Sequence, residues 1–260
     1  MYSIYVNNTP EQNKVITNKS SSIRISLATP IDLDLTKKWQ LRVLQANIFF
    51  CQPNITSANN KFSYVDGGFT FNKTIPIGLY GIDEINDTIA RITTAQNGSQ
   101  LFAFVPNPAT STTILYFSKA NCAINLSADS IMTLLGFPTS GDISGVPANG
   151  SVESTSSSQL NSLQLILVKC NITNGSYLNA DQSNIICGIP INVDYPFEQI
   201  QYNPIHPTRN NIFVNRIDNI NIDLLDQDGK PLDFTMDGTS PSEPWNITLD
   251  ISEYDSNKLL

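Results

Sequence analysis

Residues 245–251 read WNITLDI, and their apolar members stand at every second position from Trp245 to Ile251. Side chains of a strand point alternately to opposite faces of a sheet, so this spacing predicts a strand with one buried face. The apolar run LQLILV at residues 163–168 lacks that alternation and predicts a core strand. These two stretches indicate a protein built from β-sheets.

Strand patterns recur along the chain, separated by turn residues such as those of Asp66-Gly67-Gly68. The further predicted strands cover residues 22–27, 39–50, 69–75, 101–105, 112–117, 122–126, 185–193 and 216–225. Two short helices are expected between them. One begins at Ile82 with apolar residues three and four apart and ends at Asn97-Gly98, and the other covers 127–135. Ser127 is its expected N-cap and Gly136 its left-handed terminus. The predicted fold class is all-β, a single jelly-roll β-sandwich with two short helices in the connections.

The predicted domain plan has an N-terminal arm at 1–21, which begins with a short strand-like piece, and one jelly-roll domain at 22–260. The polar run at 7–22 is read either as an arm that a partner orders or as a frayed terminus, and both readings stay open. Residues 138–162 are rich in Gly, Ser, Pro and Thr, which predicts a long flexible loop in preference to an interdomain linker. The N-terminal residues lack the features of a signal peptide.

Composition argues against two classes of function. The net charge is −8, and Lys37-Lys38 is the only basic pair, so no direct nucleic-acid binding is expected. No run of 18 apolar residues occurs, so no membrane span is expected. Charged residues make up only 15% of the chain, and neutral polar residues replace them. Two explanations of this neutral polar composition stay open: a surface that contacts other proteins, or an AT-rich genome.

The residues that usually carry catalysis are scarce. His206 is the only histidine, so a single chain cannot form a multi-histidine metal site. The four cysteines have no CxxC spacing, and three stand in apolar runs, so we expect buried thiols in a reduced compartment. They are Cys51, Cys122, Cys170 and Cys187.

Acidic residues were considered as calcium ligands and as a glycosidase pair. The Asp226–Gly229 stretch fails the EF-hand pattern, because Pro231 occupies the sixth position of that loop. A turn explains Asp226 and Asp228 equally well. The pairs Asp32/Asp34 and Asp250/Glu253 reflect the acidic composition more than a glycosidase site. No catalytic, cofactor-binding or metal-binding residues are therefore predicted, and the protein is expected not to be an enzyme.

Three segments resemble elements of the penton (vertex) capsid proteins of virophages, polinton-like viruses and related large DNA viruses. Residues 79–89 read LYGIDEINDTI and are similar to that family's acidic helix start. Residues 127–137 read SADSIMTLLGF and resemble its Leu-Leu-Gly-Phe element. Residues 219–234 resemble its late strand and the aspartate-rich turn that follows it. The three motifs occur in the family's order, while the first 70 residues match poorly.

The resemblance implies a single jelly-roll structural protein that forms homopentamers at the five-fold vertices of a virion. Its implied partners are copies of itself, trimers of a double jelly-roll major capsid protein and minor capsid proteins. Assembly in the host cytoplasm is part of the same expectation. A minor fibre or cement protein with this fold remains an alternative. A carbohydrate-binding module is another, in which exposed Trp39, Trp245 and Tyr195 would stack on sugars, although the apolar phase of both tryptophans favours burial.

Overall fold

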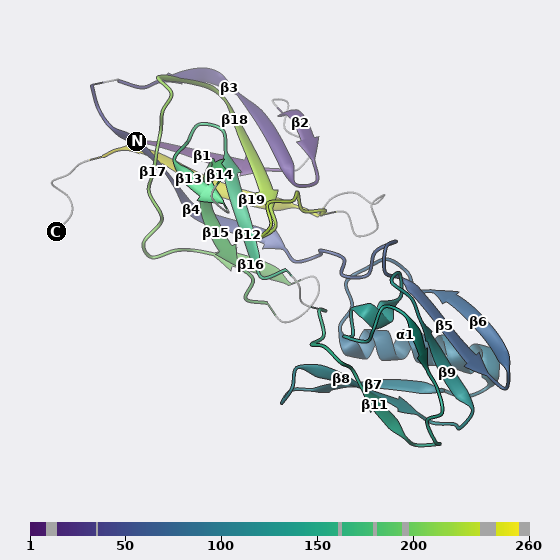
Figure 1. The fold of residues 1–260 in the computed structure, drawn as a ribbon. Helices are drawn as coiled ribbons and strands as arrows, with labels where there is room; N and C mark the ends of the chain where they lie inside the picture. Colours follow the sequence, from purple (N-terminus) through teal and green to yellow (C-terminus); the bar gives the residue numbers. More distant parts are fainter. Residues whose placement is uncertain are drawn as a thin grey trace. The chain divides into compact units, whose positions relative to one another are not determined.

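The computed structural model describes residues 1–8, 15–34, 36–160, 163–178, 181–193, 198–234 and 243–254. The chain forms two compact units (Figure 1). Unit 1 consists of Met1–Gln52 and Leu163–Leu260, and unit 2 of Pro53–Ser162. The second unit is therefore an insertion between two halves of the first.

Unit 1 is built from two antiparallel sheets. The first has the order β1 (Tyr2–Asn7), β19 (Trp245–Glu253), β4 (Trp39–Phe49) and β16 (Gln199–Tyr202), with β17 (Asn210–Asn211) also paired to β4. The second has the order β15 (Ile185–Pro190), β12 (Leu165–Cys170), β18 (Arg216–Leu225), β3 (Ser22–Asp32) and β2 (Val15–Lys19). A small hairpin joins β13 (Ser176–Leu178) to β14 (Asp181–Ser183).

Both sheets of unit 1 contribute to one hydrophobic core, which makes the unit a sandwich. Leu41 and Val43 of β4 point inward, and the bulge that follows them keeps Ala46 and Ile48 on the same face. Trp245 is buried in this core, where its indole N–H donates to the Ser20 carbonyl at 2.9 Å. The predicted all-β, jelly-roll-like class is confirmed.

Unit 2 has its own sheets and its own core. One sheet has the order β10 (Gly141–Ile143), β9 (Cys122–Leu126), β5 (Lys61–Asp66) and β6 (Phe69–Thr74), and the other β11 (Ser151–Glu153), β8 (Thr112–Phe117) and β7 (Phe102–Asn107). Aromatic rings fill the space inside, with Phe102 packed edge-to-face on Phe117 at a centroid distance of 5.3 Å. Such pairs add stabilisation beyond the area that they bury.

The first predicted helix is confirmed as α1 (Ile82–Asn97). Ile85 and Ile89 are buried, as the apolar spacing requires, and Gly98 ends the helix in the left-handed conformation at φ +74°. Asn86 fixes the helix to β7: its side-chain amide donates to the Phe104 carbonyl and accepts from the Phe104 N–H, both at 2.7 Å.

The second predicted helix is shorter than expected. It is the single 3₁₀ turn η1 (Ile131–Thr133), and Ser130, not Ser127, is its N-cap. The Ser130 hydroxyl accepts from the Met132 N–H at 3.2 Å, whereas the Ser127 hydroxyl donates to Asp129. Gly136 adopts the predicted left-handed conformation, with φ +84°.

The structure differs from the predicted domain plan in three places. The predicted arm contributes two paired strands: β1, which confirms the strand-like start of the arm and pairs with β19, and β2, which pairs with β3, while 9–14 lie outside the described residues. The predicted flexible loop at 138–162 contains β10 and β11, each paired within a sheet of unit 2. The predicted single domain is two units, because the insertion carries enough apolar side chains to close a core of its own.

The two stretches of unit 1 that flank the insertion contact the same segment of that unit. The Gln52 side chain bonds with the backbone N–H and carbonyl of Asp233, and the Gln164 N–H donates to the Gln227 side chain at 3.3 Å. Gln227 and Asp233 belong to the segment that follows β18. The chain thus leaves unit 1 and returns to it within one small region, a connection that domain insertions favour.

The fit of Gly136 gives a stability test. A Cβ atom at this position would lie 2.0 Å from the Ser156 carbonyl oxygen, and φ is positive as well. Gly136→Ala should therefore lower the unfolding free energy of unit 2 by more than ~2 kcal/mol. Gly98→Ala is the matched control, because φ is positive there but nothing lies within 4 Å. Equal losses for the two variants in urea titrations would contradict the close packing of Gly136.

Separate cores predict separate unfolding. Both tryptophans lie in unit 1, so fluorescence reports on that unit, while the circular dichroism of α1 reports on unit 2. Phe102→Ala should destabilise unit 2 by about 3–5 kcal/mol and shift the helical signal only. Leu224→Ala, in the core of unit 1, should shift the fluorescence transition only. Transitions that move together in both variants would show one cooperative unit.

Candidate interaction surface

Edge strand β1 is the first feature of unit 1 that suggests a binding surface. Among the described residues it pairs with β19 alone, so between Tyr2 and Val6 its other side presents backbone N–H and C=O groups that no described strand covers. Ile4 and Val6 point into the core, and Tyr5 projects outward with 73% of its surface exposed. The sequence YSIYVN contains no charge, proline or glycine. It therefore lacks the usual devices that keep an edge strand from pairing with another chain.

The opposite edge of the same sheet has a different character. It is formed by the short strands β16 and β17, and the connection between them contains Pro204 and Pro207. Ile205 lies in this connection and is 90% exposed, so it contributes nothing to the core. The first sheet of unit 1 thus has a regular, uncharged strand at one edge and an exposed apolar side chain at the other.

A groove of about 330 Å³ lies where β4 begins. Its walls come from the connection between β3 and β4 and from the segment after β17. The lining residues are Leu33, Asp34, Lys37, Lys38, Trp39, Asn211, Ile212, Phe213 and Val214. Phe213 is 65% exposed, and Trp39 packs partly on the core with the Tyr2 ring 6.3 Å away. The groove combines aromatic surface with charged and amide groups.

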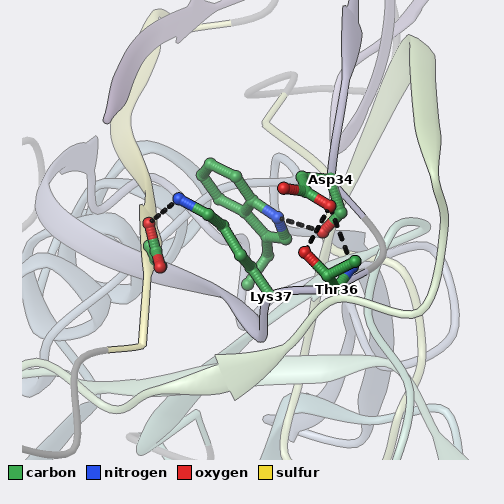
Figure 2. A network of polar contacts seen from close by, with 5 residues as sticks. Asp34, Thr36 and Lys37 are labelled. Carbon is green, nitrogen blue, oxygen red and sulfur yellow. Dashed lines mark hydrogen bonds and ion pairs between the residues drawn. The ribbon is translucent and has the colours of Figure 1, made fainter.

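Polar contacts hold the shape of this groove (Figure 2). The Asp34 carboxylate accepts from the Thr36 hydroxyl at 2.7 Å and from the Thr36 N–H at 2.9 Å. These hydrogen bonds, the side-chain one foremost, hold the pKa of Asp34 below its usual value. The Trp39 indole N–H donates to the Asp34 carbonyl at 3.1 Å, which fixes the ring against the turn.

Lys37 and Lys38 differ in their surroundings. The Lys37 ammonium lies 2.8 Å from Glu253 of β19, and this bond raises its pKa. Both partners are well exposed, so the pair contributes little to stability. Lys38 has no side-chain ion pair within the described part of the chain, although its carbonyl accepts from the Tyr254 N–H at 2.7 Å. One positive charge at the groove is therefore left uncompensated.

The two tryptophans predicted as sugar-stacking residues have different surroundings. Trp245 is buried in the core, whereas Trp39 lines the groove. Tyr195 lies outside the described residues. Phe213, which also lines the groove, was missed by sequence reasoning, because a single aromatic residue in a loop carries no periodic signal.

The acidic residues considered as glycosidase pairs have different partners. Asp250 forms an ion pair with Arg42, and Glu253 forms one with Lys37. Asp32 lies 3.8 Å from Arg216, whereas the Asp34 carboxylate accepts hydrogen bonds from Thr36.

The Asp226–Gly229 stretch forms the turn that the sequence allowed. Asp226 accepts from the N–H groups of Asp228 and Lys230, at 2.9 and 2.8 Å, so its carboxylate organises the turn. His206 lies exposed in the connection between β16 and β17. Across the described residues, no group of three or more potential metal ligands was found.

All four cysteines are buried and unpaired, as expected from their apolar surroundings. Burial raises the pKa of Cys51, Cys170 and Cys187 to about 12 and that of Cys122 to about 11. Because the thiolate is the reactive form, these side chains are structural.

The thiols predict a pH dependence with a defined sign. In the unfolded chain they lose protons near the ordinary pKa of 9.0, but the folded chain retains them to about 11 or 12. Their contribution to stability is therefore complete below about pH 9 and is lost as the pH rises. The folded protein should also resist a thiol reagent near ~pH 8 until denaturant is added. Rapid native labelling would contradict this burial.

None of the helices in the described part of the chain has the length and apolar character of a membrane-spanning helix.

No protein-family model matches the chain. No curated protein sequence matches it either. Among solved structures, the chain is similar to the crystal structure of selenomethionine-labelled mavirus penton protein. The alignment covers 97% of this chain and 100% of that one, with 13% identity and a TM-score of 0.49.

Proposed function

We propose that this chain is a structural protein of an icosahedral virion and acts by assembling into homopentamers at the five-fold vertices. The family resemblance of three ordered segments supports this role. In the structure those segments are the start of α1, the turn η1 with Gly136, and β18 with the turn after it. Each of the three segments has a role in the fold of this chain. The role in assembly comes from the family resemblance alone.

The uncharged edge strand β1 is the observation that carries the proposal. An unprotected edge strand normally leads to aggregation unless another chain covers it. Tyr5 provides an apolar contact for a partner strand, and the outer backbone groups of β1 between Tyr2 and Val6 provide hydrogen-bonding groups.

Five-fold symmetry requires two different surfaces on each copy that fit each other. Pairing of β1 with another β1 would be isologous and would stop at a dimer. A heterologous contact instead joins the β1 edge of one copy to a different surface of the next. The opposite edge, with Ile205 in its proline-bounded connection, meets that requirement.

The remaining parts of the proposal follow from the resemblance. The pentamer sits among trimers of a double jelly-roll major capsid protein, minor capsid proteins are possible neighbours, and assembly takes place in the host cytoplasm. The role requires no catalysis, metal or cofactor, and no direct contact with the genome. The virion, at the capsid vertex, is the site of action.

A charge on β1 tests the proposal. Tyr5→Lys places an ammonium on the outward face of the edge strand, where a docking strand would bury it at a cost. Native mass spectrometry of the unmodified protein should give five times 28.6 kDa, and the variant should be monomeric with unchanged thermal stability. Tyr177→Lys is the matched control, because Tyr177 is 70% exposed on the β13–β14 hairpin.

The outcomes separate the candidate roles. A pentamer that Tyr5→Lys leaves intact would remove β1 from the interface. An unmodified protein that stays monomeric at all concentrations would contradict self-assembly. A stable trimer would contradict the vertex role and favour the fibre alternative.

A further inference from the structure

We propose that the groove beside Trp39 binds a carbohydrate that carries a carboxylate group, and that the virion subunit therefore has a glycan-binding site in unit 1. The groove is defined by the lining residues given above, from Leu33 to Trp39 and from Asn211 to Val214. Lys38, Trp39 and Phe213, which carry this inference, lie outside β1, so variants at these positions leave the docking strand of the proposed pentamer unchanged.

Aromatic surface is the first requirement for sugar binding, and the groove supplies it. Sugar rings present C–H faces that pack on aromatic side chains, which hold apolar surface in a rigid shape. Trp39 is held in place by its hydrogen bond to the Asp34 carbonyl, so its ring is ordered before a ligand arrives. Phe213 contributes a second ring whose exposure has no explanation in the packing of unit 1.

Hydrogen-bonding groups at the rim are the second requirement. Asp34 is ionised and oriented by Thr36, and only one of its carboxylate oxygens, Oδ1, is used in those bonds. The other oxygen can accept from sugar hydroxyls. The Asn211 side chain also lines the groove and offers an amide beside the rings. A few polar groups placed around an apolar surface are typical of small-molecule sites.

Lys38 selects the charge of the ligand. Lys37 is compensated by Glu253, whereas Lys38 has no ion pair within the described residues. An acidic sugar brings a carboxylate to this ammonium and forms a charge-assisted hydrogen bond. In a chain of net charge −8, a local free cation in an aromatic groove is a specific feature, not a general property of the surface.

The size of the groove limits the ligand. Its volume of about 330 Å³ is at the small end of the range for small-molecule sites. The groove fits one terminal acidic residue of a glycan, with the remainder of the oligosaccharide directed to solvent. Sialic and uronic acids are the two common sources of that chemistry.

Titration of the intact protein with sugars tests the inference. The probes are N-acetylneuraminic acid, glucuronic acid and, as neutral references, glucose and galactose. Tryptophan fluorescence reports on the groove, because Trp39 lines it and the only other tryptophan, Trp245, is buried. One of the acids should bind about tenfold more tightly than the neutral sugars, and the preference should fall with salt.

Three variants locate the site. Lys38→Gln should remove the preference for the acidic sugar, and Phe213→Ala should weaken binding of every sugar. Phe69→Ala is the matched control, since Phe69 is an exposed phenylalanine on β6 of unit 2. All three side chains lie outside the buried cores, so each variant should unfold at the same temperature as the unmodified protein. Thermal unfolding of each variant checks this.

Each outcome is decisive for the inference. Acidic binding that Lys38→Gln abolishes and Phe69→Ala leaves unchanged supports it. Absence of binding, equal binding of neutral sugars, or binding that survives Phe213→Ala would overturn it. Native mass spectrometry of the same samples reports on the pentamer separately, so failure of one proposal does not imply failure of the other.

Discussion

The pairing of β19 with β4 holds the first sheet of unit 1 together, because every other strand of that sheet is attached to one of these two. Residues from opposite ends of the sequence meet in this pair, from Trp245 beside Ile48 to Glu253 beside Trp39. The Arg42–Asp250 ion pair crosses it, and the Asp250 side chain is fully buried. Removing Arg42 would leave that carboxylate unpaired, which is far more costly than the pair is stabilising.

Local hydrophobic patterns predicted the individual strands and the long helix better than they predicted how the strands are divided between the two units. Alternation identified β4, β18 and β19, and the spacing of isoleucines by three and four identified α1, because burial on one face makes apolar residues recur periodically in the sequence. This periodicity does not indicate which strands share a core. The apolar run at β12 was read as continuing a single sheet, yet an independent unit with Phe62, Phe102 and Phe117 at its centre precedes it.

The features that bear on function left weaker signals. Nothing in YSIYVN distinguishes an edge strand from a central one, because edge position depends on which strands pair with it, and among the described strands β1 pairs with β19 alone. Exposure of Ile205 and Phe213 likewise follows from where the two connections run after β16 and β17. The alternation correctly predicts that Trp39 lies on the core side of its strand. Because Trp39 is the first residue of β4, however, its ring packs only partly on the core and also lines the groove.

The groove and the proposed docking edge of unit 1 meet near β1, but they involve side chains on opposite faces of that strand. Tyr2 lies on the same face of β1 as the buried residues Ile4 and Val6, but it is 40% exposed and packs beside Trp39, whereas Tyr5 points to the opposite face. A strand that docks on the edge would therefore contact Tyr5 and the backbone while the groove stays open at the end of the sandwich. Assembly and ligand binding can then coexist in one subunit, because the alternation of a strand directs neighbouring side chains to different faces.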